Sequence, residues 1–218
     1  MKDIIVFGAG GHAKAVIDTI EKAGLYRIVG LLDGYKAAGT NVFAYDVLGS
    51  EAWLKTQGKS IHKGIIAVGD NWLRANIAAS ILSVRSDFTF VSAVHPSSSI
   101  ARGATIGAGT VVMSGAVINS DTSIGEHCVL YPHTSVDHDS SVGSFVTFAP
   151  NAVTGGNVKI GDYAVVSIGA KIIHGRSIGE HTVIGAGSTV LTDIPSYSIA
   201  YGSPARTVRS RVAGEKYL

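Results

Sequence analysis

The sequence predicts an α/β domain with Rossmann-like organisation, followed by a three-sided parallel β-helix. Two observations support this. Residues 1–94 alternate short apolar runs with segments of helical spacing, a pattern typical of βαβ units on a parallel sheet. From residue 100 to residue 190, every sixth residue is apolar except Thr154, a period that fits neither a helix nor a hairpin sheet and is typical of a hexapeptide solenoid. We therefore predict domains at residues 1–94 and 95–218.

The elements of the first domain follow from its apolar runs. Helices are expected at 13–23 and 73–82 because their apolar residues recur on one face. Strands are expected at 3–7, 27–32, 63–68 and 88–94. The first three strands end at Gly8, at Asp33 and just before Gly69, which are residues typical of turns.

A second period lies on the first in the solenoid. Directly after a repeat aliphatic stands a glycine that recurs every 18 residues, at 107, 125, 143, 161 and 179. Three hexapeptides therefore form one coil, and coils stack roughly 4.8 Å apart along the axis. Glycine fits these corners because they need either positive φ or a close backbone approach. After the solenoid, residues 207–218 are expected to form a short basic helix or tail.

The composition excludes several classes of protein. The chain has 218 residues and a formal net charge of +2, which suits anionic small molecules but not nucleic acid. The lone Cys128 gives no disulfide framework and fits a cytoplasmic protein. No apolar run approaches the ~18 residues of a membrane span, so we expect no membrane insertion. The apolar run 4–7 is too short for a signal peptide.

The segment 8–13 could bind a nucleotide. It matches G-x-G-x-x-A between a predicted strand and a predicted helix, and Asp33 follows about 20 residues later. Glycines let the backbone approach phosphate, and the helix N-terminus favours negative charge. The carboxylate of Asp33 can accept hydrogen bonds from ribose hydroxyls. About 90 residues are only half of a full dinucleotide-binding domain, so one nucleotide fits better. The alternative is a glycine turn that only joins strand to helix.

His138 is the residue with the best pattern for acid–base chemistry. It lies between Asp137 and Asp139 at a position expected to point away from the prism interior. A neighbouring carboxylate orients an imidazole and raises its basicity, which suits a general base. A lone surface histidine is usually inert, so spacing alone does not decide whether His138 is a general base or an inert surface residue. The repeat is also interrupted around Gly156, where backbone N–H groups could bind an oxyanion or form a harmless bulge.

A zinc site of His133, His138 and His174 is a further alternative. His174 is 36 residues beyond His138, which is two coils or roughly 9–10 Å along the axis. Bonds of ~2.1 Å cannot span that separation within one chain, so such a site would have to form across subunits. We expect no metal.

The motifs together resemble the sialic acid O-acetyltransferase group of hexapeptide-repeat acyltransferases, which includes nucleotide-amino-sugar N-acetyltransferases of the PglD type. The resemblance covers essentially the whole chain. It rests on GAGGHAK at 8–14, LLD at 31–33, AVGDNWLR at 67–74, VDHD at 136–139, GGNVKIGD at 155–162, IGAGSTVLTDIP at 184–195 and GSPAR at 202–206.

The resemblance implies a left-handed β-helix, a homotrimer with its active site between neighbouring subunits, and His138 as general base tuned by Asp139. It places the nucleotide sugar against Gly10, Gly11, His12, Asp33, Gly34 and Gly69. It places acetyl-CoA near Thr147, Ile168 and Ala186. Some members carry a second histidine where this chain has Thr147.

The function that this resemblance implies is N-acetylation of a nucleotide-linked amino sugar, of the UDP- or dTDP-4-amino-sugar type, in surface glycan biosynthesis. His138 would take the amine proton, backbone amides near Gly156 would bind the oxyanion, and transfer would be direct because Cys128 sits at a core position. Two alternatives remain: O-acetylation of a sialic acid, and a solenoid scaffold with a nucleotide-sensing domain and no activity.

Overall fold

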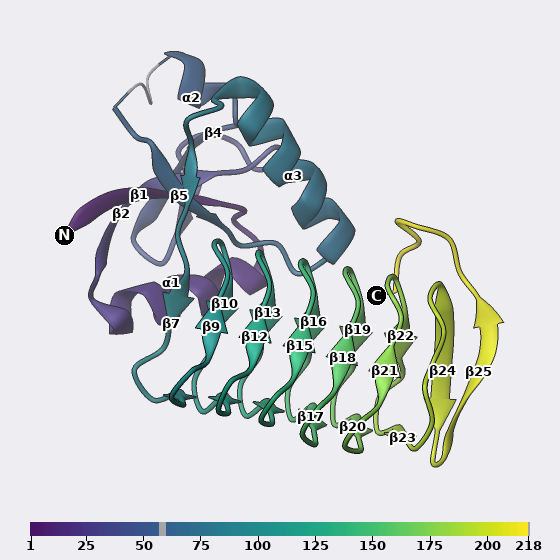
Figure 1. Ribbon diagram of the computed structural model, residues 1–218. Helices are drawn as coiled ribbons and strands as arrows, with labels where there is room; N and C mark the ends of the chain where they lie inside the picture. The colour runs from purple at the N-terminus through teal and green to yellow at the C-terminus, as the bar shows by residue number, and fades with distance from the viewer. Residues whose placement is uncertain (57–59, 218) are drawn as a thin grey trace.

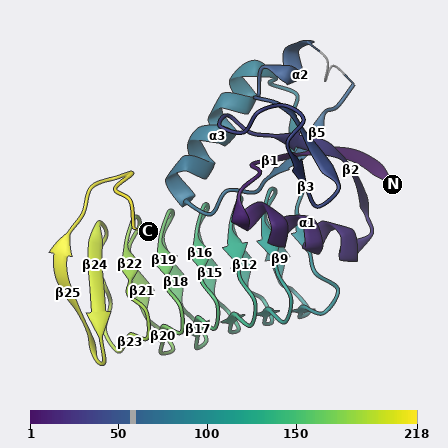
Figure 2. The same ribbon diagram turned by 180° about the vertical axis from the view of Figure 1, so that it is seen from behind.

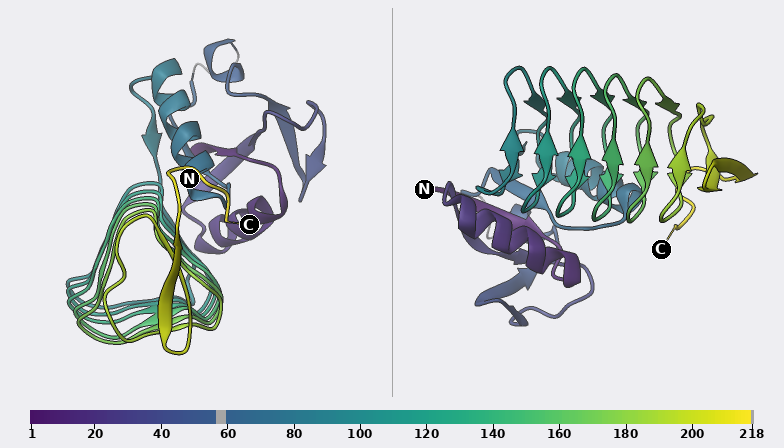
Figure 3. Two further views of the ribbon diagram at one scale, coloured as in Figure 1. Left: turned by 90° about the vertical axis from the view of Figure 1, so that its right-hand side faces the viewer. Right: turned by 90° about the horizontal axis from the view of Figure 1, so that it is seen from below.

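The N-terminal α/β domain packs beside a row of stacked coils (Figure 1). This arrangement comes from a computed structural model that describes residues 1–56 and 60–217. Viewed along the axis of the row, the coils superpose into a triangle, and the N-terminal domain lies outside it (Figure 3). The chain is therefore an α/β domain followed by a left-handed parallel β-helix, as the sequence predicts.

A mostly parallel sheet forms the centre of the N-terminal domain. Its strands are β1 (Lys2–Phe7), β2 (Tyr26–Leu32), β3 (Asn41–Val42), β4 (Tyr45–Gly49), β5 (Lys63–Ile66) and β6 (Thr89–Phe90), in the order β3-β4-β2-β1-β5-β6. Strand β1 runs parallel to both of its neighbours, β2 and β5. After β1 the chain first adds β2, β3 and β4 on one side of β1, and then adds β5 and β6 on the other side. The carboxyl end of β1 is therefore the place where such sheets bind ligands.

Helices cover both sides of this sheet (Figure 2). They are α1 (Gly11–Ala23), α2 (Trp53–Thr56) and α3 (Asn71–Val84). Helix α1 lies between the sheet and the solenoid, and its apolar face joins one core cluster with Val111 and Val129. Helices α2 and α3 pack on the opposite face of the sheet. Asp70 caps α3, because its carboxylate accepts the Leu73 N–H at 2.8 Å.

The solenoid has three faces, each a ladder of short strands that are all parallel except β25 at the end of the first face. The first face holds β7 (Ala93–Val94), β10 (Val111–Val112), β13 (Val129–Leu130), β16 (Thr147–Phe148), β19 (Val165–Val166), β22 (Val183–Ile184), β24 (Ser198–Gly202) and β25 (Ala205–Ser210). The second face holds β8 (Ser99–Ile100), β11 (Val117–Ile118), β14 (Ser135–Val136), β17 (Val153–Thr154), β20 (Lys171–Ile172) and β23 (Thr189–Val190). The third face holds β9 (Thr105–Ile106), β12 (Ser123–Ile124), β15 (Ser141–Val142), β18 (Lys159–Ile160) and β21 (Ser177–Ile178). The N-terminal domain packs against the first face.

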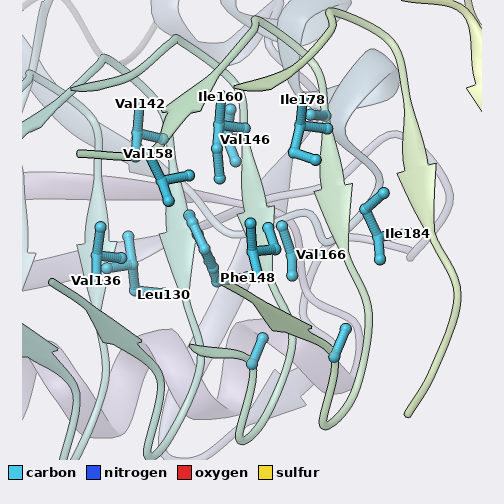
Figure 4. Close-up of a cluster of buried hydrophobic side chains, with 14 of the residues drawn as sticks. Leu130, Val136, Val142, Val146, Phe148, Val158, Ile160, Val166, Ile178 and Ile184 are labelled. Carbon is cyan, nitrogen blue, oxygen red and sulfur yellow. The ribbon is translucent and has the colours of Figure 1, made fainter. Parts of the chain in front are cut away.

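The repeat aliphatics fill the interior of the prism. Leu130, Phe148, Val166 and Ile184 stack from coil to coil beneath the first face (Figure 4). One coil cannot bury such side chains alone, so stability comes from stacking neighbouring coils. Thr154, the exception in the repeat, is also buried, and its hydroxyl accepts the Asp137 N–H at 3.2 Å.

The tight corners use a left-handed backbone conformation at every sixth residue. Positive φ occurs at 103, 109, 115, 121, 127, 133, 139, 145, 151, 157, 163, 169, 175, 181 and 187, and most of these residues are not glycine. The glycines of the 18-residue period instead allow the backbones of successive coils to approach closely. A Cβ at Gly107 would lie 2.5 Å from the carbonyl carbon of Gly125, so the close approach of successive coils requires glycine there.

Three sequence-based expectations about elements were wrong or incomplete. The segment 88–94 forms two strands rather than one, because β6 belongs to the N-terminal sheet and β7 to the solenoid. The tail forms no helix in its described part. Strand β25 instead pairs antiparallel with β24, and Leu218 lies outside the described residues. The short elements β3, β4 and α2 were not expected.

The domain division after residue 94 stays a prediction. In the part of the chain that the structure describes, no helix is long and apolar enough to cross a membrane.

Candidate functional site

A pocket of about 560 Å³ opens at the carboxyl ends of β2, β1 and β5. Three loops that follow these strands form its wall. The residues predicted to bind the nucleotide sugar all line this one pocket: Gly10, Gly11, His12, Asp33, Gly34 and Gly69. Figures 1 and 2 show the loops at the edge of the sheet that faces the solenoid. A glycine loop at the N-terminus of α1 suits phosphate, since the N–H groups of Gly10 and Gly11 have no partner among the described residues and can bind an anion.

Asp33 fixes two of these loops to each other. One carboxylate oxygen accepts the Ala9 N–H at 2.8 Å, and the other accepts the N–H groups of Tyr35 and Lys36 at 2.8 and 3.0 Å. Burial opposes the charged form, but these three N–H donors and Lys36 outweigh it and hold the pKa of Asp33 below its usual value. The carboxylate is thus ionised, and the oxygen that accepts the Ala9 N–H has one acceptor site left for a ribose hydroxyl.

His12 forms a neutral part of the pocket wall. Its Nδ1 lies 2.9 Å from the hydroxyl of Tyr131 on the solenoid. Its Nε2 is buried and has no hydrogen-bond partner among the described residues. Burial, followed by the positive charge of Arg74, lowers the pKa of His12 to about 4. The ring is therefore uncharged near neutral pH and joins the pocket to the solenoid.

His138 lies at the corner between the second and third faces, between β14 and β15. Its Nδ1 is 2.7 Å from a carboxylate oxygen of Asp139, and its backbone N–H donates to Asp137 at 2.8 Å. The hydrogen bond to Asp139, and then the charge of Asp137, raises the pKa of His138. Because Nδ1 donates to Asp139, the neutral ring carries its lone pair on Nε2, as a general base requires.

Gly156 lies one coil beyond His138, directly against the imidazole. A Cβ there would be 2.6 Å from both Cε1 and Nε2 of His138. The Gly156 carbonyl accepts the Gly175 N–H at 2.9 Å, whereas the Gly156 N–H has no partner among the described residues. A free N–H beside the imidazole has the chemistry of an oxyanion donor.

The residues predicted to contact CoA occupy two different environments. Ile168 is 59% exposed and Ala186 is exposed, and both lie one coil apart on the corner between the first and second faces. Thr147 on β16 is only 5% exposed and lies beneath the N-terminal domain. Its hydroxyl accepts a hydrogen bond from Arg74 at 3.3 Å. Contact of these three residues with CoA stays a prediction.

The pocket and His138 are on opposite sides of the solenoid. The N-terminal domain packs against one side of the triangle, the first face (Figure 3). His138 lies between β14 on the second face and β15 on the third, at the corner opposite the first face. His138 is not among the residues that line the pocket. One chain therefore does not bring the pocket and His138 together.

The three histidines of the zinc alternative are not gathered in this chain. His133 lies at the corner between the first and second faces, and His138 and His174 lie two coils apart at the next corner. Among residues 1–56 and 60–217, no group of three His, Cys, Asp or Glu side chains could hold a metal ion. Independence from metal stays a prediction.

Sequence analysis missed Arg74, Tyr131 and Tyr217, which join the pocket to the solenoid and the tail. For Arg74 a signal existed. It precedes Ala78 and Ile81 by four and seven residues, so it falls on the buried stripe of its helix. A charged residue in such a stripe needs buried acceptors.

Comparisons with known proteins cover both domains. Residues 3–81 match the PglD N-terminal domain, and residues 157–192 match the bacterial transferase hexapeptide, six repeats. UDP-N-acetylbacillosamine N-acetyltransferase of Bacillus subtilis is 31% identical over 124 residues, which is 52% of this chain and 52% of that protein. The match thus spans about half the length of this curated relative.

Solved structures match over nearly the full chain. PerB from Caulobacter crescentus, in complex with CoA and GDP-perosamine, is 31% identical with a TM-score of 0.88, covering 95% of this chain and 97% of PerB. The acetyltransferase domain of PglB from Neisseria gonorrhoeae, in complex with acetyl coenzyme A, is 27% identical with a TM-score of 0.86, covering 95% and 99%.

Proposed function

Because the chain belongs to the hexapeptide-repeat acetyltransferases that carry a PglD N-terminal domain, we propose that it transfers acetyl from acetyl-CoA to the amine of a nucleotide-linked amino sugar. The observation that carries this proposal is the likeness to PerB, which extends over 95% of the chain and includes both domains. The product would serve surface glycan biosynthesis. We place the reaction in the cytoplasm, where acetyl-CoA and nucleotide sugars are made.

The nucleotide sugar would occupy the pocket at the carboxyl edge of the sheet. Gly10 and Gly11 at the N-terminus of α1 would approach the diphosphate, and Asp33 would accept a ribose hydroxyl. His12, Gly34 and Gly69 would complete the wall. The acetyl-CoA arm would run along the exposed corner marked by Ile168 and Ala186.

The chemistry would be a direct acyl transfer. His138 Nε2 would take a proton from the sugar amine as the nitrogen attacks the thioester carbonyl, and Asp139 would stabilise the imidazolium. The N–H of Gly156 would bind the oxyanion of the tetrahedral intermediate. As the intermediate collapses, the C–S bond breaks and the thiolate of CoA takes the proton from His138. Burial raises the pKa of Cys128 to about 12, so this thiol is a poor nucleophile for an acyl-enzyme.

A homotrimer would complete this site. The nucleotide pocket and His138 lie on opposite sides of one chain, so the base would come from a neighbouring subunit. Exposed apolar side chains directly after two strands of the second face suit an interface: Ile173 and Leu191 are 36% and 44% exposed.

Acetylation assays with a panel of UDP-, dTDP-, GDP- and CMP-linked amino sugars test the proposal. We expect CoA release with at least one amino sugar, and a loss of at least ~10² in kcat for His138→Ala. Transfer to the hydroxyl of a sialic acid instead would support the O-acetyltransferase alternative. Nucleotide binding with no CoA release from any acceptor would support the scaffold alternative.

A further inference from the structure

The buried side chain of Arg74 forms hydrogen bonds with the loop of residues 68–70. Arg74 on α3 is fully buried and forms no ion pair with any described residue. Its Nη1 donates to the carbonyls of Val68 and Gly69 at 2.9 and 3.0 Å. Its remaining donors reach the solenoid, at the carbonyls of His127 (2.8 Å) and Phe145 (3.2 Å) and the hydroxyl of Thr147. One side chain thus ties a pocket loop to two coils.

The C-terminal tail provides a second hold on the same loop. After β25 the tail returns to the start of α3, and the hydroxyl of Tyr217 donates to the Gly69 carbonyl at 3.2 Å. The Thr147 side chain and the Asn71 backbone also lie beside this hydroxyl. Burial raises the pKa of Tyr217, so the phenol keeps its proton and remains a donor.

These contacts fix the direction of two peptide groups. The C=O and N–H of a trans peptide point in opposite directions. The carbonyls of Val68 and Gly69 both turn toward Nη1 of Arg74, so the N–H groups of Gly69 and Asp70 turn away from it. Neither N–H has a hydrogen-bond partner among the described residues. Val68 and Gly69 both line the nucleotide pocket.

Successive N–H groups that point the same way form a concavity that binds anions. This one lies at the N-terminus of the 14-residue helix α3, whose dipole adds to the effect. It also lies beside the loop of residues 8–11, because β1 and β5 are adjacent parallel strands. The pocket therefore has backbone donors on two sides.

We propose that Arg74 and Tyr217 are positioning residues that hold the 68–70 loop so that the N–H groups of Gly69 and Asp70 face the diphosphate of the bound nucleotide sugar. This inference rests on the proposed function. Neither side chain touches the ligand. Each acts through the Gly69 carbonyl, which it holds on the side of the solenoid.

The charges around the loop agree with an anionic ligand. Arg74 is a buried cation that forms no ion pair with any described residue, and its field contributes to the lowered pKa of His12 in the pocket wall. The only carboxylate of the loop, Asp70, caps α3 and interacts with the charges of both Arg74 and Arg211. The guanidinium fork is needed for this arrangement, because one lysine ammonium cannot reach acceptors on both the loop and two coils.

Calorimetric titration of the full-length protein with UDP, dTDP, GDP, CMP and acetyl-CoA tests the inference. Tyr217→Phe removes the hydroxyl that donates a hydrogen bond to the Gly69 carbonyl. We expect it to raise the Kd of the preferred nucleotide about three- to tenfold, the size of one hydrogen bond, with acetyl-CoA affected less than twofold. Arg74→Lys should raise the nucleotide Kd by more than ~10-fold.

Matched controls separate this role from a general loss of structure. Tyr26 on β2 and Arg27, which forms a surface ion pair with Asp3, do not line the pocket. Tyr26→Phe and Arg27→Lys should therefore bind the nucleotide and acetyl-CoA like the wild type. If Arg74→Lys does not fold, Tyr217→Phe alone decides. Wild-type nucleotide affinity in Tyr217→Phe would overturn the inference, and so would equal weakening of nucleotide and acetyl-CoA. A wild-type protein that binds none of the four nucleotides would instead overturn the proposed function itself.

Discussion

The imidazole of His138 rests against the backbone of Gly156, one coil farther along the solenoid. A Cβ at Gly156 would come within 2.6 Å of Cε1 and Nε2 of the ring. Asp139 holds the other side of the same ring through Nδ1 at 2.7 Å. The position of Nε2 is therefore set by one carboxylate and by the absence of one side chain.

Gly156→Ala should displace this ring without unfolding the protein. We expect kcat to fall about 10²-fold, because a shift of about 1 Å in a catalytic group costs that much. The measurement is steady-state kinetics together with a thermal melt. Ser120→Ala, in the same column one coil before His138, is the matched control and should keep normal turnover. Wild-type kcat in Gly156→Ala would show that the ring need not occupy its observed position.

The pH dependence should report the carboxylate beside His138. The base must be neutral, so kcat/KM falls as the pH drops through the pKa of His138, which is raised above the ordinary 6.5 chiefly by Asp139. Asp139→Asn removes this stabilisation of the imidazolium, and the acidic limb should move to lower pH with a lower maximal rate. Asparagine also tolerates the left-handed backbone at this position, where φ is 55°.

The control for this profile is Asp87→Asn, which alters the similar His62–Asp87 pair, 2.8 Å apart, on the N-terminal domain. Its profile should match the wild type. An acidic limb that does not move in Asp139→Asn would rule out His138 as the group that titrates.

The assembly should have a mass near three times 22.5 kDa by light scattering. Leu191→Glu places a charge on the exposed apolar side of the second face and should shift the protein toward smaller species, with loss of activity. Val29→Glu, at a residue of similar exposure on β2, should leave the mass unchanged. A wild-type monomer that is active at the concentration of the assay would refute the shared site.

The two substrates should respond to different substitutions. A Cβ at Gly11 meets nothing within 4 Å in the protein, so Gly11→Val should fold normally and obstruct only the pocket. We expect at least a tenfold rise in KM for the nucleotide sugar and little change for acetyl-CoA. Ala186→Glu should do the reverse, because it places an anion on the exposed corner assigned to the CoA arm. Equal effects on both KM values in both variants would contradict this division.

Activity should survive chelation. The candidate histidines lie at separate corners or two coils apart, so we expect EDTA to leave turnover unchanged. The activity of His174→Ala should depend on pH as that of the wild type does. Metal analysis of purified protein is the second readout. Stoichiometric zinc, with activity that EDTA removes and zinc restores, would revive the zinc alternative.

The solenoid could be predicted in detail because its period is local. An apolar residue every six positions and a glycine every 18 specify the coil without any knowledge of the rest of the chain. The loop after β1, Asp33 and Gly69 could likewise be brought to one edge, since the carboxyl ends of parallel strands share that edge.

The contacts between domains could not be predicted in this way. Arg74 meets the carbonyls of His127 and Phe145, which are 53 and 71 residues away, and Tyr217 meets Gly69 across 148 residues. A repeat whose three faces are similar in sequence does not specify which face a neighbouring domain will cover. For the same reason, the sequence could not reveal that Thr147 is buried and that its hydroxyl is occupied.

The reversal of direction between β24 and β25 has a consequence for how the row of coils ends. A ladder of parallel strands offers each new strand the same edge, and an unpaired edge can also pair with a strand from another molecule. Strand β25 pairs antiparallel along β24 from Ser198 to Gly202 and so occupies the edge that a further coil would use. On this face the last hairpin therefore replaces the parallel edge of the repeat with an antiparallel one, which a further coil of the same repeat would not match.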